Sequence, residues 1–80
     1  MRLRLGIIGG GQLGRYLCAA ARELGIVTVV MTDEAEPPAA ATADRVIHGG
    51  LGDLAAARTL VEAVDVVTFE IEAVGADVLD

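Results

Sequence analysis

The stretch that decides the fold is Gly9-Gly10-Gly11-Gln12-Leu13-Gly14. A short apolar, β-branched run at residues 3–8 precedes it and predicts a buried strand. An Ala- and Leu-rich run from residue 15 onward follows it and predicts a helix, which Gly25 is expected to close. Residues 26–32 form a second β-branched run, which ends at Asp33. The order is therefore strand, glycine-rich turn, helix and strand.

The glycine-rich turn is a candidate ligand site. Glycines allow a tight turn and a close approach of a ligand to the backbone, and the N-terminus of the next helix offers N–H groups to an anion. With an acid about twenty residues further on, this setting predicts a Rossmann-like unit. The structural alternative is a tight turn without a ligand. Gly10 and the polar Gln12 favour a binding role, because a glutamine amide both donates and accepts hydrogen bonds.

The rest of the chain continues the alternation of strands and helices. Residues 34–38 are acidic and Pro-rich and predict a loop, residues 39–44 one short helical turn, and residues 45–48 a third strand that ends at glycines. Asp53 is the expected N-cap of a helix over residues 54–64. Its expected apolar face is made of Leu54, Ala57, Leu60, Val61 and Val64. Residues 65–72 predict a fourth strand, and residues 74–80 begin another helix.

This order predicts an α/β fold with a four-stranded parallel sheet flanked by helices. Helices between strands imply right-handed crossovers, and the expected strand order is 3-2-1-4. In such sheets a ligand binds beyond the carboxyl ends of the strands, at the switch between strands 1 and 4. The topology therefore brings Gln12 and Glu70 to one crevice. Glu70 and Glu72 project to opposite sides of a strand, so only Glu70 is expected to face the crevice; the alternative is a solvated strand end.

Composition limits the classes of function. Eighty residues form one small domain, and with 54% hydrophobic residues but one Phe and one Tyr the core must consist of Val, Leu, Ile and Ala. The net charge of −6 argues against nucleic acid and against an anionic membrane surface as partners. A single cysteine excludes an internal disulfide. With no secretory signal and no apolar stretch long enough to span a membrane, the chain is expected to be cytoplasmic.

The other side chains that could take part in catalysis or binding are expected to have structural roles or to be exposed to solvent. Asp33 stands where a dinucleotide-binding enzyme holds a ribose hydroxyl, but Glu34 and Glu36 beside it favour a solvated loop acid. Cys18 is expected to be a small core residue, and His48 an exposed residue at a strand end. These residues do not make a metal site, and the chain carries no complete catalytic constellation.

Three segments resemble, in the same order, carboxyaminoimidazole ribonucleotide synthase, the ATPase subunit of phosphoribosylaminoimidazole carboxylase. This family belongs to the ATP-grasp enzymes. The first segment is the glycine turn with its flanks, residues 6–15, and the second runs from Pro37-Pro38-Ala39 to Ala43-Asp44 and the following strand. The third is Asp65-Val66-Val67-Thr68-Phe69-Glu70-Ile71-Glu72-Ala73-Val74.

The resemblance implies ATP-dependent carboxylation of aminoimidazole ribonucleotide by bicarbonate, through carboxyphosphate, in de novo purine synthesis. Residues 1–80 would be the Rossmann-like, N-terminal pre-ATP-grasp domain, which helps to hold the ribonucleotide. ATP and Mg²⁺ would bind in central and C-terminal regions absent from this chain, so the chain alone is expected to bind no cofactor and to be non-catalytic. The parent enzyme is expected to be a homodimer.

The resemblance also implies the site residues. By position, Gly11, Gln12 and Leu13 in the turn and Glu70 after the fourth strand should contact the substrate. Backbone N–H groups and the Gln12 amide would bind polar ligand atoms, and Glu70 would accept from sugar hydroxyls or the amine.

Departures from the family pattern keep alternatives open. Tyr16 stands where Met is common, and Ala73 replaces a usual Asn, as in the related formate-dependent glycinamide ribonucleotide transformylase. That relative carries Glu where this chain has Gln12. A second alternative is an NAD-binding oxidoreductase domain, based on the glycine pattern and Asp33, and a third is a non-catalytic module that pairs with separate ATP-grasp chains. Because an isolated four-stranded unit leaves apolar surface uncovered, we expect self-association or marginal stability.

Overall fold

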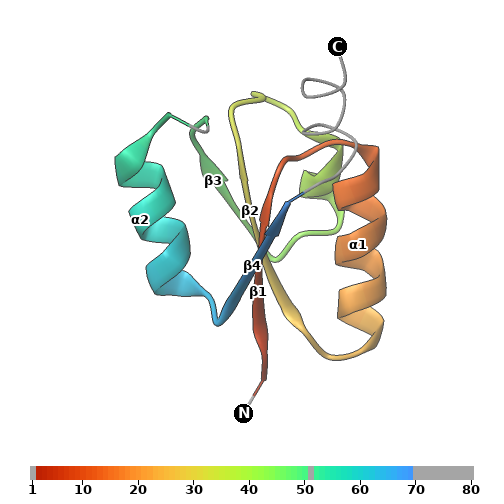
Figure 1. Ribbon diagram of the computed structural model, residues 1–80. Coiled ribbons are helices and arrows are strands. Elements are labelled where there is room, and N and C mark those ends of the chain that lie inside the picture. Colours follow the sequence, from red (N-terminus) through yellow and green to blue (C-terminus); the bar gives the residue numbers. More distant parts are fainter. Residues whose placement is uncertain (1, 51, 70–80) are drawn as a thin grey trace.

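The computed structural model describes residues 2–50 and 52–69, which form a parallel sheet with helices on both faces (Figure 1). The strands are β1 (Arg4–Ile8), β2 (Val27–Thr32), β3 (Arg45–His48) and β4 (Val66–Phe69). The helices are α1 (Gln12–Glu23), the short 3₁₀ helix η1 (Pro38–Ala41) and α2 (Leu54–Ala63). The strand order β3-β2-β1-β4 confirms the predicted α/β topology. The expected end of the fourth strand and the helix over 74–80 lie outside the described residues.

The core consists of two apolar layers, one on each face of the sheet. Successive β2 side chains alternate between them, because a strand directs neighbouring side chains to opposite faces. One layer packs against α2 and contains Val29, Met31, Ile47, Ala56, Leu60 and Val64. The other packs against α1 and η1 and contains Ile7, Cys18, Val30 and Ala39. Among the described residues both layers lack aromatic side chains, as predicted, but Met31 and Cys18 join the Val, Leu, Ile and Ala side chains of the core.

Helix α1 begins at Gln12, earlier than predicted, and ends in a Schellman motif. The Ile26 N–H donates to the Ala21 carbonyl at 2.8 Å, and the Gly25 N–H donates to the Arg22 carbonyl at 3.0 Å. Gly25 has a φ of 77°, which a residue with a side chain rarely adopts. The predicted closing glycine is therefore confirmed.

The N-cap of α2 is the predicted one. Asp53 has extended backbone, and its Oδ1 accepts a hydrogen bond from the Ala56 N–H at 2.9 Å. The helix runs over Leu54–Ala63, with Val64 as its C-cap.

The predicted apolar face of α2 is partly wrong. Leu60 and Val64 are buried as expected, but Leu54 is 83% exposed and Val61 is 62% exposed. Ala56, which was not predicted to face the core, is buried instead. The buried stripe is therefore the i, i+4, i+8 series through residues 56, 60 and 64.

Gly6 in β1 explains this rotation of α2. A Cβ atom on Gly6 would lie 2.9 Å from Val64 Cγ2 and 3.1 Å from Leu60 Cδ1. The missing side chain leaves a recess in the sheet that these two side chains fill. Because neither Leu54 nor Val61 reaches the recess, their apolar character does not decide which face of the helix is buried.

An exposed ion pair joins the amino-terminal ends of β1 and β4. Arg4 Nη2 lies 3.0 Å from Asp65 Oδ1, and the Arg4 backbone N–H donates to Asp65 Oδ2 at 2.9 Å. The hydrogen bond from the Arg4 side chain is the main reason that the pKa of the Asp65 carboxyl is lowered. The pair aligns β4 beside β1 at the edge of the sheet.

This ion pair predicts an acid-dependent contribution to stability. Because the Asp65 pKa is lower in the folded than in the unfolded chain, its contribution is present above about pH 4 and is lost as the pH falls through the folded-state value. Asp65→Asn should therefore show a shallower fall in Tm than the wild type between about pH 5 and pH 3. Arg4→Gln should give an intermediate slope, because the backbone N–H at position 4 still donates to Asp65 Oδ2, and the double variant should match Asp65→Asn. Parallel slopes in the wild type and both single variants would contradict this.

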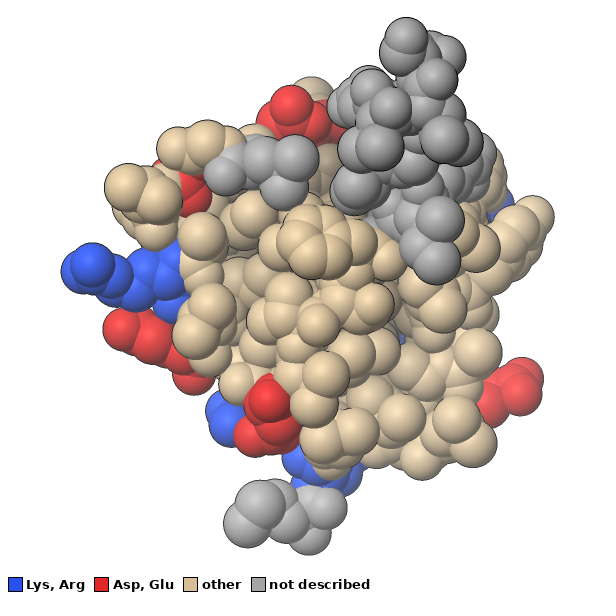
Figure 2. Space-filling model, viewed as in Figure 1, with Lys and Arg blue, Asp and Glu red and all other residues tan. Residues whose placement is uncertain are grey.

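The edge strand β4 carries an apolar surface. Its side chains Val66, Val67 and Phe69 are exposed, with Phe69 at 50%. Figure 2 shows a broad uncharged area on the side of the molecule where β4 lies, with Arg, Asp and Glu side chains around it. The expected self-association or marginal stability has a physical basis in this surface, and it stays a prediction. Among the described residues, no helix is long and apolar enough to cross a membrane.

Candidate functional site

The glycine turn leaves β1 by a backbone conformation that requires glycine. Gly9 has a φ of 115°, and its N–H donates to the Met31 carbonyl at 2.9 Å. The chain thus passes over the end of β2 before α1 begins. Gly11, the N-cap of α1, has φ −77° and ψ −163°, a conformation open to any residue. The backbone itself therefore gives no reason for glycine at this position.

Gly10 has a packing role. A Cβ atom there would lie 2.7 Å from Pro37 Cβ and 3.0 Å from Thr32 Cβ. The Gly10 carbonyl accepts a hydrogen bond from the Ala39 N–H at 3.0 Å. Close packing against Thr32 and Pro37 thus gives Gly10 a structural role, beside the ligand-binding role that its place in the turn predicts.

The turn ends at the N-terminus of α1. The N–H groups of the first helical turn have no acceptor within the helix, and the N-cap residue, Gly11, makes no side-chain cap bond to them. The first bond of the helix is that from the Arg15 N–H to the Gly11 carbonyl at 3.0 Å. Gln12 is exposed and Leu13 is partly buried. At the N-terminus of α2, the Asp53 carboxylate accepts from the Ala56 N–H.

The predicted partner of this turn follows β4. Ile8 at the end of β1 is paired with Phe69 at the end of β4, so the two strands end side by side. Glu70, the next residue, lies outside the described residues, and its predicted approach to Gln12 stays a prediction. Asp33 follows β2 at the same edge of the sheet and is exposed, near the backbone of Gly50.

Cys18 and His48 occupy the positions expected of them. Cys18 is fully buried in the α1 layer, and burial raises the pKa of its thiol, so it stays protonated. His48 is exposed at the end of β3. Within residues 2–50 and 52–69, no three His, Cys, Asp or Glu side chains are grouped so as to hold a metal ion.

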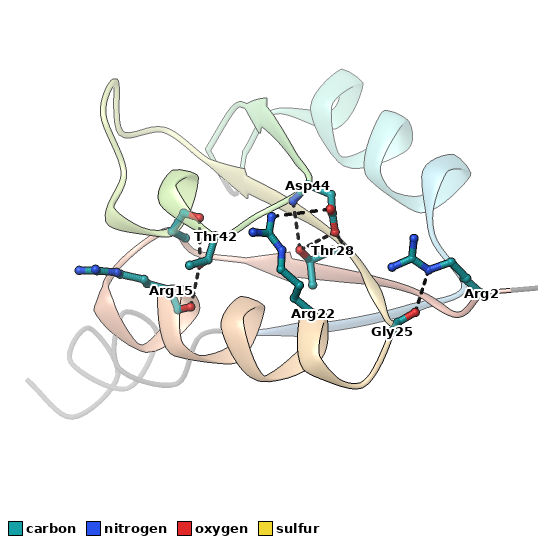
Figure 3. Close-up of polar contacts among 8 residues, drawn as sticks. Arg2, Arg15, Arg22, Gly25, Thr28, Thr42 and Asp44 are labelled. Carbon is teal, nitrogen blue, oxygen red and sulfur yellow. Dashed lines mark hydrogen bonds and ion pairs between the residues drawn. The ribbon is translucent and has the colours of Figure 1, made fainter.

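The sequence does not predict the contacts that residues 42–44, after η1, make with α1 and β2 (Figure 3). The Thr42 hydroxyl donates to the Arg15 carbonyl at 2.8 Å. Asp44 Oδ2 accepts from the Thr28 N–H at 2.8 Å, and Asp44 Oδ1 lies 3.9 Å from Arg22 Nη2. These are contacts between residues distant in sequence, and no local pattern indicates them.

Comparison with known families decides the identity of this domain. Residues 2–80 match the Ribonucleotide synthetase preATP-grasp domain. The chain belongs to this family. The predicted family resemblance is thereby confirmed for the domain.

Individual relatives of this pre-ATP-grasp chain agree with the family assignment. It is 43% identical over 76 residues to the N5-carboxyaminoimidazole ribonucleotide synthase of Brucella melitensis, which covers 95% of this chain and 21% of the relative. It is 44% identical over 68 residues to the enzyme of that name from Synechococcus elongatus, over 85% of this chain and 17% of the relative. The structure of N5-carboxyaminoimidazole synthetase from Staphylococcus aureus complexed with ADP matches with a TM-score of 0.81 and 31% identity, over 86% of this chain and 19% of that chain.

The pre-ATP-grasp chain spans about a fifth of the length of the relatives that it matches. These relatives are named as carboxyaminoimidazole ribonucleotide synthases or synthetases. The comparisons give no support to the NAD-binding oxidoreductase or to the glycinamide ribonucleotide transformylase.

Proposed function

We propose that this chain is the N-terminal, substrate-binding part of an ATP-dependent ligase. The ligase carboxylates aminoimidazole ribonucleotide with bicarbonate in de novo purine biosynthesis. The observation that carries the proposal is the 43% identity over 76 residues to a protein named N5-carboxyaminoimidazole ribonucleotide synthase. The match of residues 2–80 to the pre-ATP-grasp family supports it.

In this proposal, the turn before α1 and the end of β4 hold the ribonucleotide. Gly11 lets the ligand approach the backbone, and the N–H groups of Gln12 and Leu13 bind its polar or anionic atoms. The Gln12 amide adds a donor and an acceptor, and the Glu70 carboxylate accepts from sugar hydroxyls or the amine. The start of α1 at Gln12, directly after the glycine turn, supports the part of this site that falls within the described residues.

The chemistry of carboxylation needs groups beyond this chain. We propose that ATP and Mg²⁺ bind in the central and C-terminal regions of a cytoplasmic, homodimeric parent enzyme. The ADP complex of the Staphylococcus aureus relative supports nucleotide binding by the parent enzyme. The residues described here supply substrate orientation, and none of them is assigned to nucleotide or metal.

Calorimetric titration of the chain with aminoimidazole ribonucleotide tests the proposed binding role. Gln12→Ala should raise the Kd about fivefold, because about one net hydrogen bond to the ligand is lost. Asp33→Ala is the matched control at the same edge of the sheet and should leave the Kd unchanged. An unchanged Kd in Gln12→Ala, or a raised Kd in Asp33→Ala, would argue against the proposed site.

A further inference from the structure

We propose that Thr42 is a positioning residue, whose hydroxyl fixes the first turn of α1 in the place where that turn meets the ligand. The inference rests on the proposed ribonucleotide-binding role of the α1 N-terminus. Thr42 belongs to residues 37–44, which follow β2 and include η1. We call these residues the η1 segment.

The N-terminal end of the η1 segment packs against the glycine turn and is hydrogen-bonded to it. The Ala39 N–H donates to the Gly10 carbonyl at 3.0 Å, and the Pro37 ring occupies the space that a Gly10 side chain would need. Ala39 is fully buried, in the same apolar layer as Cys18 of α1. The backbone just before α1 therefore has one preferred place against the segment.

Thr42 connects the η1 segment to helix α1 by a hydrogen bond. Its hydroxyl donates to the Arg15 carbonyl at 2.8 Å, across 27 positions of sequence (Figure 3). Arg15 closes the first turn of α1, because its N–H donates to the Gly11 carbonyl at 3.0 Å. A displacement of Arg15 would thus move the N–H groups of the residues that precede it.

The far end of the η1 segment is anchored independently. The Asp44 carboxylate accepts from the N–H and the hydroxyl of Thr28 in β2, at 2.8 and 3.3 Å. The Asp44 N–H donates to the Thr28 carbonyl at 3.1 Å. Asp44 is bonded to the sheet two residues after Thr42, so the backbone at Thr42 has little freedom to move. The Thr42 hydroxyl can therefore fix the position of the Arg15 carbonyl in α1. Binding sites depend on such support, since a group displaced by about 0.5 Å loses its productive geometry.

Amide hydrogen exchange in Thr42→Val tests this role without a ligand. The exchange rates of the Arg15 and Ala39 amides should rise about fivefold relative to that of Val30 in the centre of β2. Normalising to Val30 separates a local effect from a general loss of stability, because global unfolding would speed all three amides. Thr42→Ser keeps the hydroxyl and should restore the wild-type ratios.

A matched control and a second readout complete the experiment. Thr59 in α2 also donates its hydroxyl to a helix carbonyl, that of Ala55 at 2.9 Å, so Thr59→Val should leave the Arg15 and Ala39 ratios unchanged. In titrations with aminoimidazole ribonucleotide, Thr42→Val should raise the Kd about fivefold and Thr42→Ser should restore it.

The outcomes separate the two proposals. Wild-type exchange ratios in Thr42→Val would overturn the positioning role, even if the Kd changed, because Thr42 would then contact the ligand directly. Altered ratios that Thr42→Ser restores, in a chain that does not bind the ribonucleotide, would leave the positioning of the turn supported and the proposed function contradicted.

Discussion

Leu60→Ala is expected to lower the free energy of unfolding by about 3 kcal/mol, the largest loss predicted for this chain. Leu60 is 1% exposed and packs in the α2 layer with Val29, Met31 and Val64. Truncation removes its transfer free energy and leaves a cavity beside Gly6 that the aliphatic neighbours fill only in part. A domain of this size has little stability to lose, so much of the population should unfold. Urea denaturation followed by circular dichroism measures the change.

Leu54→Ala is the matched control for Leu60→Ala. It makes the same chemical change in the same helix, but Leu54 is 83% exposed, so the free energy of unfolding should change by less than about 0.5 kcal/mol. Equal losses in the two variants would mean that α2 is rotated relative to the structure and that the face predicted from sequence is the buried one.

Gly10→Ala is expected to lower the free energy of unfolding by about 2 kcal/mol. The new Cβ would lie 2.7 Å from Pro37 Cβ and 3.0 Å from Thr32 Cβ. Neither neighbour is the free end of a flexible side chain, so the glycine turn must move instead. We also expect the amide signals of Gly11 and Gln12 to shift, because the start of α1 moves with the turn.

Gly52→Ala is the control for this substitution. Among the described residues beyond its chain neighbours, no heavy atom lies within 4 Å of a Cβ built at Gly52. Alanine at this position should be neutral or stabilise the chain by up to about 1 kcal/mol, since it restricts the unfolded state. If Gly10→Ala proves as mild as Gly52→Ala, the close packing of the turn against Pro37 is not real.

The topology was predictable because each local signal agreed with the others. Alternating strands and helices left few arrangements of a parallel sheet, and the glycine turn with Gly25 marked both ends of the first helix. Asp53 marked the start of α2 in the same way. These signals are encoded within a few residues of the elements that they define.

The orientation of α2 and the support of the turn depend on contacts between distant residues. Leu54, Leu60 and Val61 are all apolar, and the sequence does not show that Leu60 is the one that packs over Gly6 and is buried. Likewise, the sequence around Thr42 does not indicate that its hydroxyl donates to the Arg15 carbonyl. The packing role of Gly10 has the same origin, because the sequence does not show that Pro37 lies against it.

The central claim is that the turn before α1 binds the purine-pathway ribonucleotide, and amide NMR tests it most directly. The chain is titrated with aminoimidazole ribonucleotide, and with NAD in parallel. We predict shifts at Gly11, Gln12, Leu13 and Glu70 with the ribonucleotide alone. Shifts at the glycine turn and Asp33 with NAD alone, or none at the turn with the ribonucleotide, would contradict the claim.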